Sequence, residues 1–147
     1  MHKRLLFLSI FLVNTLFAQQ VHLDVAISYF EKGKYSLAQN LFENIPNSED
    51  AKYYSAICAK MLFASDALDQ LNQFLDEHPY SLYRDDIYLS LSDIFYRKKE
   101  YKDVIRYYKL ISQPLTNEHR FKLAYSYFCI NLYNEASYHF SFLINHS

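Results

Sequence analysis

The sequence contains very few of the residues that make turns: one glycine and three prolines in 147 residues. An all-β fold needs a turn signal roughly every 8–12 residues, so this scarcity argues against one. Tryptophan is absent too, but 15 Tyr and 12 Phe make the chain far too aromatic for a disordered protein. The composition therefore favours an all-helical domain with a real apolar core.

Motifs for catalysis or cofactor binding are also missing. One glycine cannot form a Gly-rich phosphate loop, and no pair of histidines has the spacing of a His-Glu-x-x-His metal site. Cys58 and Cys129 lie in no nucleophile motif. Asp85 and Asp86 are adjacent, so they point to different sides of a helix, and a role in capping that helix is the better interpretation. We therefore expect no enzyme activity, no catalytic residue, no metal site and no cofactor.

The first 18 residues have the layout of a secretory signal peptide. Lys3 and Arg4 give a basic start, and an apolar run follows from residue 5 to Ala18. This run is shorter than the ~20 residues that a bilayer-spanning helix needs. We expect cleavage between Ala18 and Gln19, with an uncleaved anchor as the alternative. No cysteine follows the run, so we expect an exported chain without a lipid anchor.

The charge balance gives no general attraction to polyanions. Removing Lys3 and Arg4 with the leader leaves 13 basic against 16 acidic residues, a net charge of −3. The basic segment "RKKEYKDVIRYYK" also contains Glu100 and Asp103, so it is predicted to be a solvated helix face. We expect no nucleic-acid partner, and at most a peripheral association with a membrane.

Four copies of one helical pattern follow the leader. Each has a bulky residue before a small one, and the small residues are Ala26, Ser55, Ser92 and Ala124. Twelve residues later comes a second small or β-branched residue, and four further on a large one. Both halves have the i, i+3, i+4, i+7 spacing of an amphipathic helix. The fixed interval within copies, and the variable interval between them, predict hairpins in strict register that surface loops connect.

The apolar stripes of these hairpins are predicted to form the core. The aromatic residues expected there are Phe42, Phe95, Tyr127 and Phe140. Cys58 and Cys129 lie two repeats apart, whereas a disulfide needs a Cα separation under ~7 Å. We therefore expect two buried thiols that act as small apolar side chains.

The pattern resembles the tetratricopeptide repeat (TPR) family, whose unit is a helix–turn–helix of about 34 residues. The match lies in "AISYFEKGKYSLAQNLF", "LSDIFYRKKEYKDVIRYY" and "LAYSYFCINLYNEASYHF", and more weakly in "YSAICAKMLFASDALDQL". The stretch "FLDEHPYSLYRDDIYLSLSDIFYRKKEY" is similar to exported bacterial members in particular. The resemblance implies an all-α fold: a right-handed α-solenoid of about four TPR-like hairpins in residues 19–147, after the signal peptide of residues 1–18. The expected hairpins span about 20–46, 49–78, 84–112 and 116–145.

Gly33 stands where the family has its turn glycine, and other residues replace it in the remaining three turns. Asn131 tolerates the left-handed conformation, but Leu62 and Lys99 would incur a cost of about 1–2 kcal/mol there. We therefore expect Leu62 and Lys99 to have negative φ. A left-handed Leu62 would mean that the second repeat is placed wrongly.

The resemblance implies a protein-binding surface. The first helices of stacked hairpins line a concave face in such arrays, and the residues expected there are Lys52, Lys60, Asp93, Tyr96, Arg97, Tyr125 and Phe128. Tyrosines beside charged groups suit an extended peptide or a partner helix, and packing against the next repeat is the alternative role. The leading hypothesis is a non-enzymatic interaction module or scaffold of the bacterial cell envelope. It would act in the periplasm or at the outer membrane.

An incomplete array is the second hypothesis. The last apolar helix, "NEASYHFSFLINHS", is followed by no polar capping helix. Its apolar side chains would then form an association surface. The chain would be the N-terminal piece of a longer TPR protein, or a self-associating structural unit, of an outer-membrane assembly or secretion system.

Overall fold

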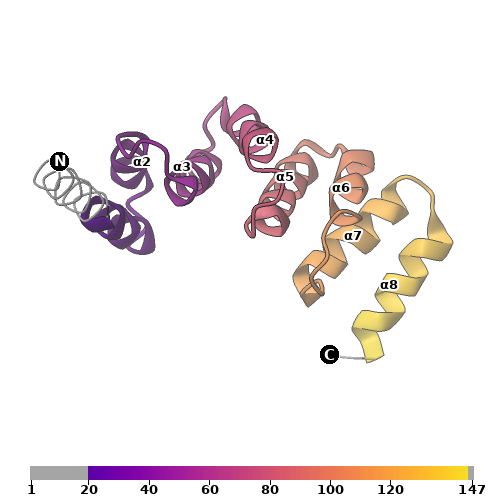
Figure 1. Ribbon diagram of the computed structural model, residues 1–147. Coiled ribbons are helices and arrows are strands. Elements are labelled where there is room, and N and C mark those ends of the chain that lie inside the picture. Colours follow the sequence, from indigo (N-terminus) through magenta and orange to yellow (C-terminus); the bar gives the residue numbers. More distant parts are fainter. Residues whose placement is uncertain (1–19, 146–147) are drawn as a thin grey trace, which may run out of the picture. The chain divides into compact units, whose positions relative to one another are not determined.

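A computed structural model describes residues 20–145, and these residues form helices and turns with no strand among them. The predicted signal peptide therefore lies outside the described residues. A helix over residues 20–31 comes first. It is followed by α2 (Tyr35–Glu43), α3 (Glu49–Met61), α4 (Ala67–Glu77), α5 (Arg84–Lys98), α6 (Tyr101–Tyr108), α7 (Asn117–Cys129) and α8 (Tyr133–Asn145) (Figure 1).

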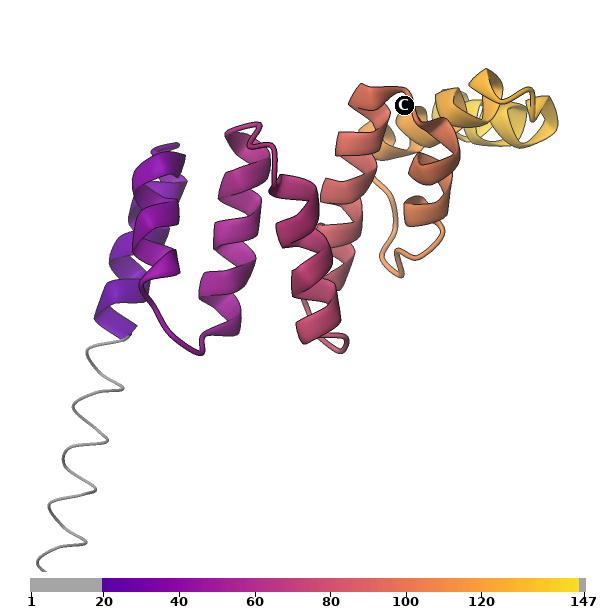
Figure 2. The same cartoon turned by 90° about the horizontal axis from the view of Figure 1, so that it is seen from above.

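The helices belong to two compact units that divide between Gln70 and Leu71, inside α4. Unit 1 contains the helix over residues 20–31, α2 and α3, and in it α2 packs against α3. Unit 2 contains α5 to α8, in which each helix packs against the next. Within unit 2, α7 and α8 lie side by side (Figure 1). A short turn joins α5 to α6, and a longer loop leads from α6 to α7 (Figure 2).

All four hairpin turns close in the same way. One residue in each turn has a left-handed φ: 71° at Gly33, 56° at Phe63, 62° at Lys99 and 63° at Asn131. In the first turn the next residue, Lys34, donates its N–H to the carbonyl of Tyr29, five residues back, over 2.9 Å. The other three turns repeat this bond. Two backbone hydrogen bonds per turn, in the Schellman arrangement, therefore satisfy carbonyls at the end of each first helix.

Two turns correct the expectations drawn from the sequence. The negative φ expected at Lys99 is wrong, because Lys99 occupies the left-handed position of its closure. The negative φ expected at Leu62 is confirmed at −82°. The left-handed residue of that turn is Phe63, one position later. In both turns the hydrogen bonds of the closure outweigh the cost that a Cβ atom adds in this conformation.

Phe63 also shows that the repeat frame of the second hairpin is wrong by one residue in its first helix. The small residue lies seven positions before the left-handed one in the other hairpins, and that count gives Ala56 in place of Ser55. Ala56 is buried, and Ala67 remains the buried small residue of α4. The interval between the two small residues is therefore eleven here, although more residues separate the two helices than in the other hairpins.

The core of unit 1 interlocks large and small side chains from three helices. Ala26 and Ala38 are fully buried, which lets their helices approach closely. Phe42 stacks on Tyr54 of α3 with a centroid distance of 5.2 Å. Cys58 is a free, fully buried thiol in the same cluster, as predicted. Burial, with a contribution from the Glu43 carboxylate, raises the pKa of Cys58 to about 11.

The core of unit 2 confirms part of the predicted aromatic stripe. Phe95 and Tyr127 are buried, and Phe95 stacks on Tyr107 of α6 at 5.5 Å. Phe140 is only half-buried, so its assignment to the core is wrong in part. The reason is that among the described side chains of α8 only Ala136 is buried. Cys129 is a free thiol that is half-buried, so the expectation of a buried thiol there also needs correction.

Candidate functional site

Four aromatic rings from three helices of unit 2 meet on one surface, which we call the aromatic face. It consists of Tyr96 on α5, Tyr101 at the start of α6, and Phe121 and Tyr125 on α7. Tyr125 lies 6.1 Å from Tyr96 and 5.9 Å from Tyr101, measured between ring centroids, and both contacts are edge-to-face. Phe121 stacks on Tyr125 at 6.3 Å. Such ring pairs are favourable beyond the area they bury, so the rings hold one another in place.

The aromatic face remains partly open to solvent. Phe121 and Tyr125 are 49% and 37% exposed, while Tyr96 and Tyr101 are half-buried. Burial, followed by a hydrogen bond to Cys129, raises the pKa of Tyr101 to about 12. Burial and the neighbouring Tyr125 also raise the pKa of Tyr96. Both phenols are therefore neutral near pH 7. Because the Tyr101 O–H is engaged with Cys129, Tyr96 is the phenol that presents an O–H group next to the apolar rings.

An ion triad lies beside the aromatic face. Lys122 on α7 contacts Asp93 of α5 at 2.8 Å and Glu118 of α7 at 2.7 Å. Burial alone would lower the pKa of Lys122, but its hydrogen bonds to the two carboxylates outweigh burial and raise it. The hydrogen bond from Lys122 in turn lowers the pKa of Glu118. The triad keeps its charges paired and fixes α7 against α5.

The residues predicted from the sequence are brought together only in part. Asp93, Tyr96 and Tyr125 share the surface described above. Arg97 is exposed one helical turn beyond Asp93. Phe128 is about half exposed and pairs with Tyr133 of α8 at 5.6 Å.

The two predicted lysines lie in the other unit. Lys52 and Lys60 are both on α3, where Lys52 is exposed and Lys60 is half-buried. Their part in a binding surface stays a prediction.

Sequence reasoning missed Tyr101, Phe121, Lys122 and Cys129. The signal for two of them was present, because Lys122, Tyr125 and Cys129 follow the i, i+3, i+7 spacing of one helix stripe. Tyr101 is the first residue of α6. Its contact with the next hairpin depends on packing that spacing alone does not give.

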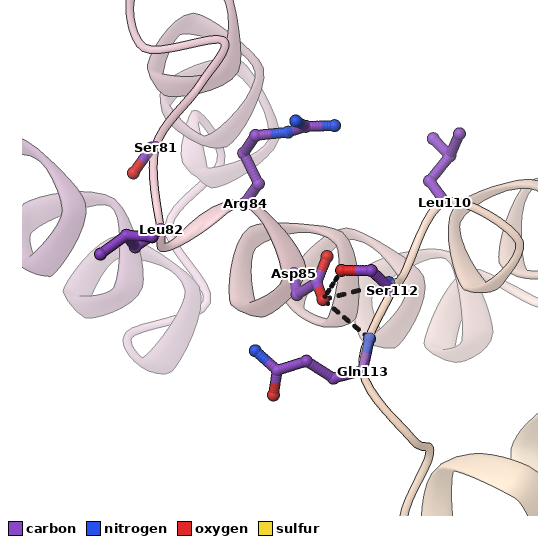
Figure 3. A pocket seen from close by; sticks show the side chains of 7 residues that line it. All are labelled: Ser81, Leu82, Arg84, Asp85, Leu110, Ser112 and Gln113. Carbon is purple, nitrogen blue, oxygen red and sulfur yellow. Dashed lines mark hydrogen bonds between the residues drawn. The ribbon is translucent and has the colours of Figure 1, made fainter.

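Asp85 has a different role from the predicted one. Its buried carboxylate accepts hydrogen bonds from the Ser112 N–H at 3.1 Å, the Ser112 hydroxyl at 2.7 Å and the Gln113 N–H at 3.0 Å (Figure 3). Capping of its own helix is therefore wrong, since Asp85 already lies within α5 and holds the loop after α6. A side-chain cap is present at Ser48, whose hydroxyl accepts the Ala51 N–H at the start of α3.

The surface around Asp85 is a shallow hollow of about 320 Å³. It is lined by Ser81, Leu82, Arg84, Asp85, Leu110, Ser112 and Gln113 (Figure 3). The loop donors already occupy one oxygen of the carboxylate at its base. We therefore assign this hollow a structural role.

Two further properties concern residues 20–145 alone. Within this range, no three His, Cys, Asp or Glu side chains are grouped so that they could bind a metal ion. None of the helices in the same range combines the length and apolar character that crossing a membrane requires.

Comparison with known proteins gives a match in fold alone. No protein-family model matches the sequence, and no curated protein matches it. Among solved structures, MamA AMB-1 in crystal form P212121 matches with a TM-score of 0.74 and 19% identity, over 88% of this chain and 73% of that one. A MamA point mutant matches in two structures, with TM-scores of 0.72 and 0.73 and 19% identity. These cover 86% and 88% of this chain and 72% and 77% of those chains. MamA is a TPR-like helical repeat protein, so the predicted all-α, TPR-like helical-repeat fold is confirmed.

Proposed function

We propose that the chain is a non-enzymatic protein-interaction module of the bacterial cell envelope that binds a segment of a partner protein on the aromatic face. The observation that carries the proposal is this face itself: four mutually packed rings from three helices, left partly open to solvent. Tyrosines offer large, rigid contact area together with a polar group, and they are enriched where binding energy concentrates. The TPR-like fold supports the proposal, because helical repeats present extended binding surfaces of this kind.

The chemistry of the face favours an extended peptide or a helix with apolar side chains. The rings of Phe121 and Tyr125 would take up those side chains, and the phenol group of Tyr96 would donate to a backbone carbonyl. The paired charges of Lys122 and Asp93 would border the bound segment without being left unpaired. Arg97, exposed on the same helix as Asp93, would set the preferred charge of the flanking residues.

A photo-crosslinking experiment tests the site. A benzophenone amino acid replaces Tyr125 in the full chain, and the matched control carries it at Tyr138, an exposed ring on α8. We expect the Tyr125 probe to give a discrete protein adduct in cells that the control does not give. Tyr96→Ala should weaken the adduct several-fold. Identical adducts at both positions, or none at Tyr125, would contradict the assignment.

The envelope location is a separate part of the proposal and rests on the predicted signal peptide of residues 1–18. The module would lie in the periplasm or at the outer membrane, without a lipid anchor and at most peripheral to the membrane. Intact mass measurement of the chain from fractionated cells should show loss of residues 1–18 outside the cytoplasm. A full-length chain confined to the cytoplasm would overturn this location and leave the aromatic face untouched.

A self-associating structural unit is the second candidate function. It is favoured by α8, where Tyr133 and Ile144 are exposed and Glu135 is the one charged residue of thirteen. Solvated helices normally carry more charge on their outer face. Adducts between two copies of this chain in the crosslinking experiment would favour this candidate.

A further inference from the structure

The first described helix exposes apolar side chains at positions that are buried elsewhere in the chain. Val21 lies five residues before the small residue Ala26 and is 51% exposed. Val25 lies directly before Ala26 and is 45% exposed. The residues at these positions in the third hairpin are Ile87 and Leu91, both 0% exposed. We call the surface of Val21 and Val25 the head face.

The last described helix exposes a second surface, which consists of one aromatic and one polar side chain. Ala136 on α8 and Val104 on α6 are the equivalent buried residues of their hairpins. Three residues before them lie Tyr133 and Tyr101, and one residue after them lie Ser137 and Ile105. In α6 the first position is covered by Tyr125 of α7 at 5.9 Å, and Ile105 is 5% exposed. In α8, Tyr133 is 56% exposed and Ser137 is also exposed. We call the surface of Tyr133 and Ser137 the tail face.

Each unit contains a junction that shows what such faces bind. In unit 2, α6 packs against α7 through Tyr101 and Tyr125, and Tyr108 lies 6.1 Å from His119. In unit 1, α2 packs against α3, where Phe42 stacks on Tyr54. Both junctions join the second helix of one hairpin to the first helix of the next. The tail face is a second-helix surface and the head face is a first-helix surface, so they are the two halves of this junction.

We infer that the chain associates head to tail with a second copy of itself, the tail face of one copy covering the head face of the next. The contact would reproduce the α6–α7 junction between molecules and bury the apolar side chains that each face exposes. Because two different surfaces meet, the contact is heterologous and extends into a row of copies. The aromatic face takes no part, so this inference stands or falls independently of the proposed peptide site.

Complementing variants test the inference in the full chain by sedimentation. The head variant is Val21→Glu with Val25→Glu, and the tail variant is Tyr133→Glu with Ser137→Glu. The parent chain should increase in mass with concentration, while each variant alone stays at the mass of one chain. An equimolar mixture of the two should reach about twice that mass and no more, because one intact head face and one intact tail face remain.

Tyr138→Glu is the matched control, since Tyr138 corresponds to the exposed Arg106 and lies outside the tail face. It should associate like the parent chain. The proposal is overturned if the head and tail variants associate as strongly as the parent chain. It is also overturned if the head variant still dimerises alone. Circular dichroism confirms that each variant is folded. A parent chain that stays monomeric at every concentration overturns the proposal without reference to any variant.

Discussion

Lys122 on α7 donates a hydrogen bond from Nζ to Oδ1 of Asp93 on α5 over 2.8 Å. The two side chains are only 20% and 23% exposed, so water screens this pair less than a surface ion pair. The bond joins the first helices of two consecutive hairpins within unit 2. It therefore fixes the two helices that supply Tyr96 and Tyr125 to the aromatic face.

Asp93→Ala should destabilise the protein by about 1–3 kcal/mol, because it leaves a partly buried ammonium group with one acceptor fewer. Urea unfolding measures the change. Glu118→Gln is the control, since the side chain of Glu118 is largely exposed and its bond to Lys122 lies within one helix. It should cost less than about 1 kcal/mol. Equal losses of unfolding free energy in the two variants would show that the bond between the hairpins stabilises the protein no more than the bond within α7.

Acidification should weaken unit 2 through His139. Burial, and then the neighbouring Arg120 cation, lowers the pKa of His139. The folded state therefore binds this proton less readily than the unfolded chain. The stabilising contribution is complete above the unfolded pKa of about 6.5 and is lost as the pH falls through the folded pKa.

His139→Phe should flatten the dependence of unfolding free energy on pH below about 6.5, because it removes this titration. The substitution keeps a ring where His139 stacks on Tyr127 at 5.7 Å. An unchanged slope in the His139 variant would show that other groups set the acid sensitivity.

Asp85→Ala should cost about 2–3 kcal/mol and loosen the loop between α6 and α7. Three donors lose a charged acceptor, and hydrogen bonds to a charged group contribute more than neutral ones. Amide hydrogen exchange should speed up at Ser112 and Gln113 before the helices are affected. Asp86→Ala, at the exposed neighbouring position, should leave both rates unchanged. Slow exchange at Ser112 in the Asp85 variant would contradict the role of this anchor.

Lys99→Gly should stabilise the protein by about 1 kcal/mol. Lys99 is left-handed at φ 62°, where glycine avoids the Cβ penalty that exceeds its own entropic cost. Leu62→Gly is the opposite control, since Leu62 has a negative φ and glycine there should destabilise by about 1 kcal/mol. Thermal melts of both variants give the comparison. Changes of the same sign would contradict the assignment of the two turns.

The sequence predicted the helices and most of the core because both depend on local spacing. The buried Phe95 and Tyr127 each stack on a ring of their own hairpin, so local spacing is enough to place them in the core. The frame of α3 could not be decided in this way. Ser55 and Ala56 are both small and both buried, so either fits the pattern. Only the turn geometry at Phe63 separates the two.

The aromatic face and its ion triad were less predictable, because they join separate hairpins. Asp93 and Lys122 are 29 residues apart, and nothing in the spacing of either helix pairs them. Tyr101 contacts Tyr125 across the same boundary. Charge and aromatic type could be read from the sequence. The contacts depend on how one hairpin packs on the next.

The shared closure of the four turns has a consequence for how such a chain can evolve. Glycine, phenylalanine, lysine and asparagine occupy the same backbone state. Each non-glycine residue adds a cost of at most about 1–2 kcal/mol, which is small enough for a repeat array to tolerate one turn at a time. The turn glycine can thus be lost by successive neutral or mildly harmful substitutions while the hairpin persists. The backbone geometry of such a turn can therefore stay the same while the residues that form it differ.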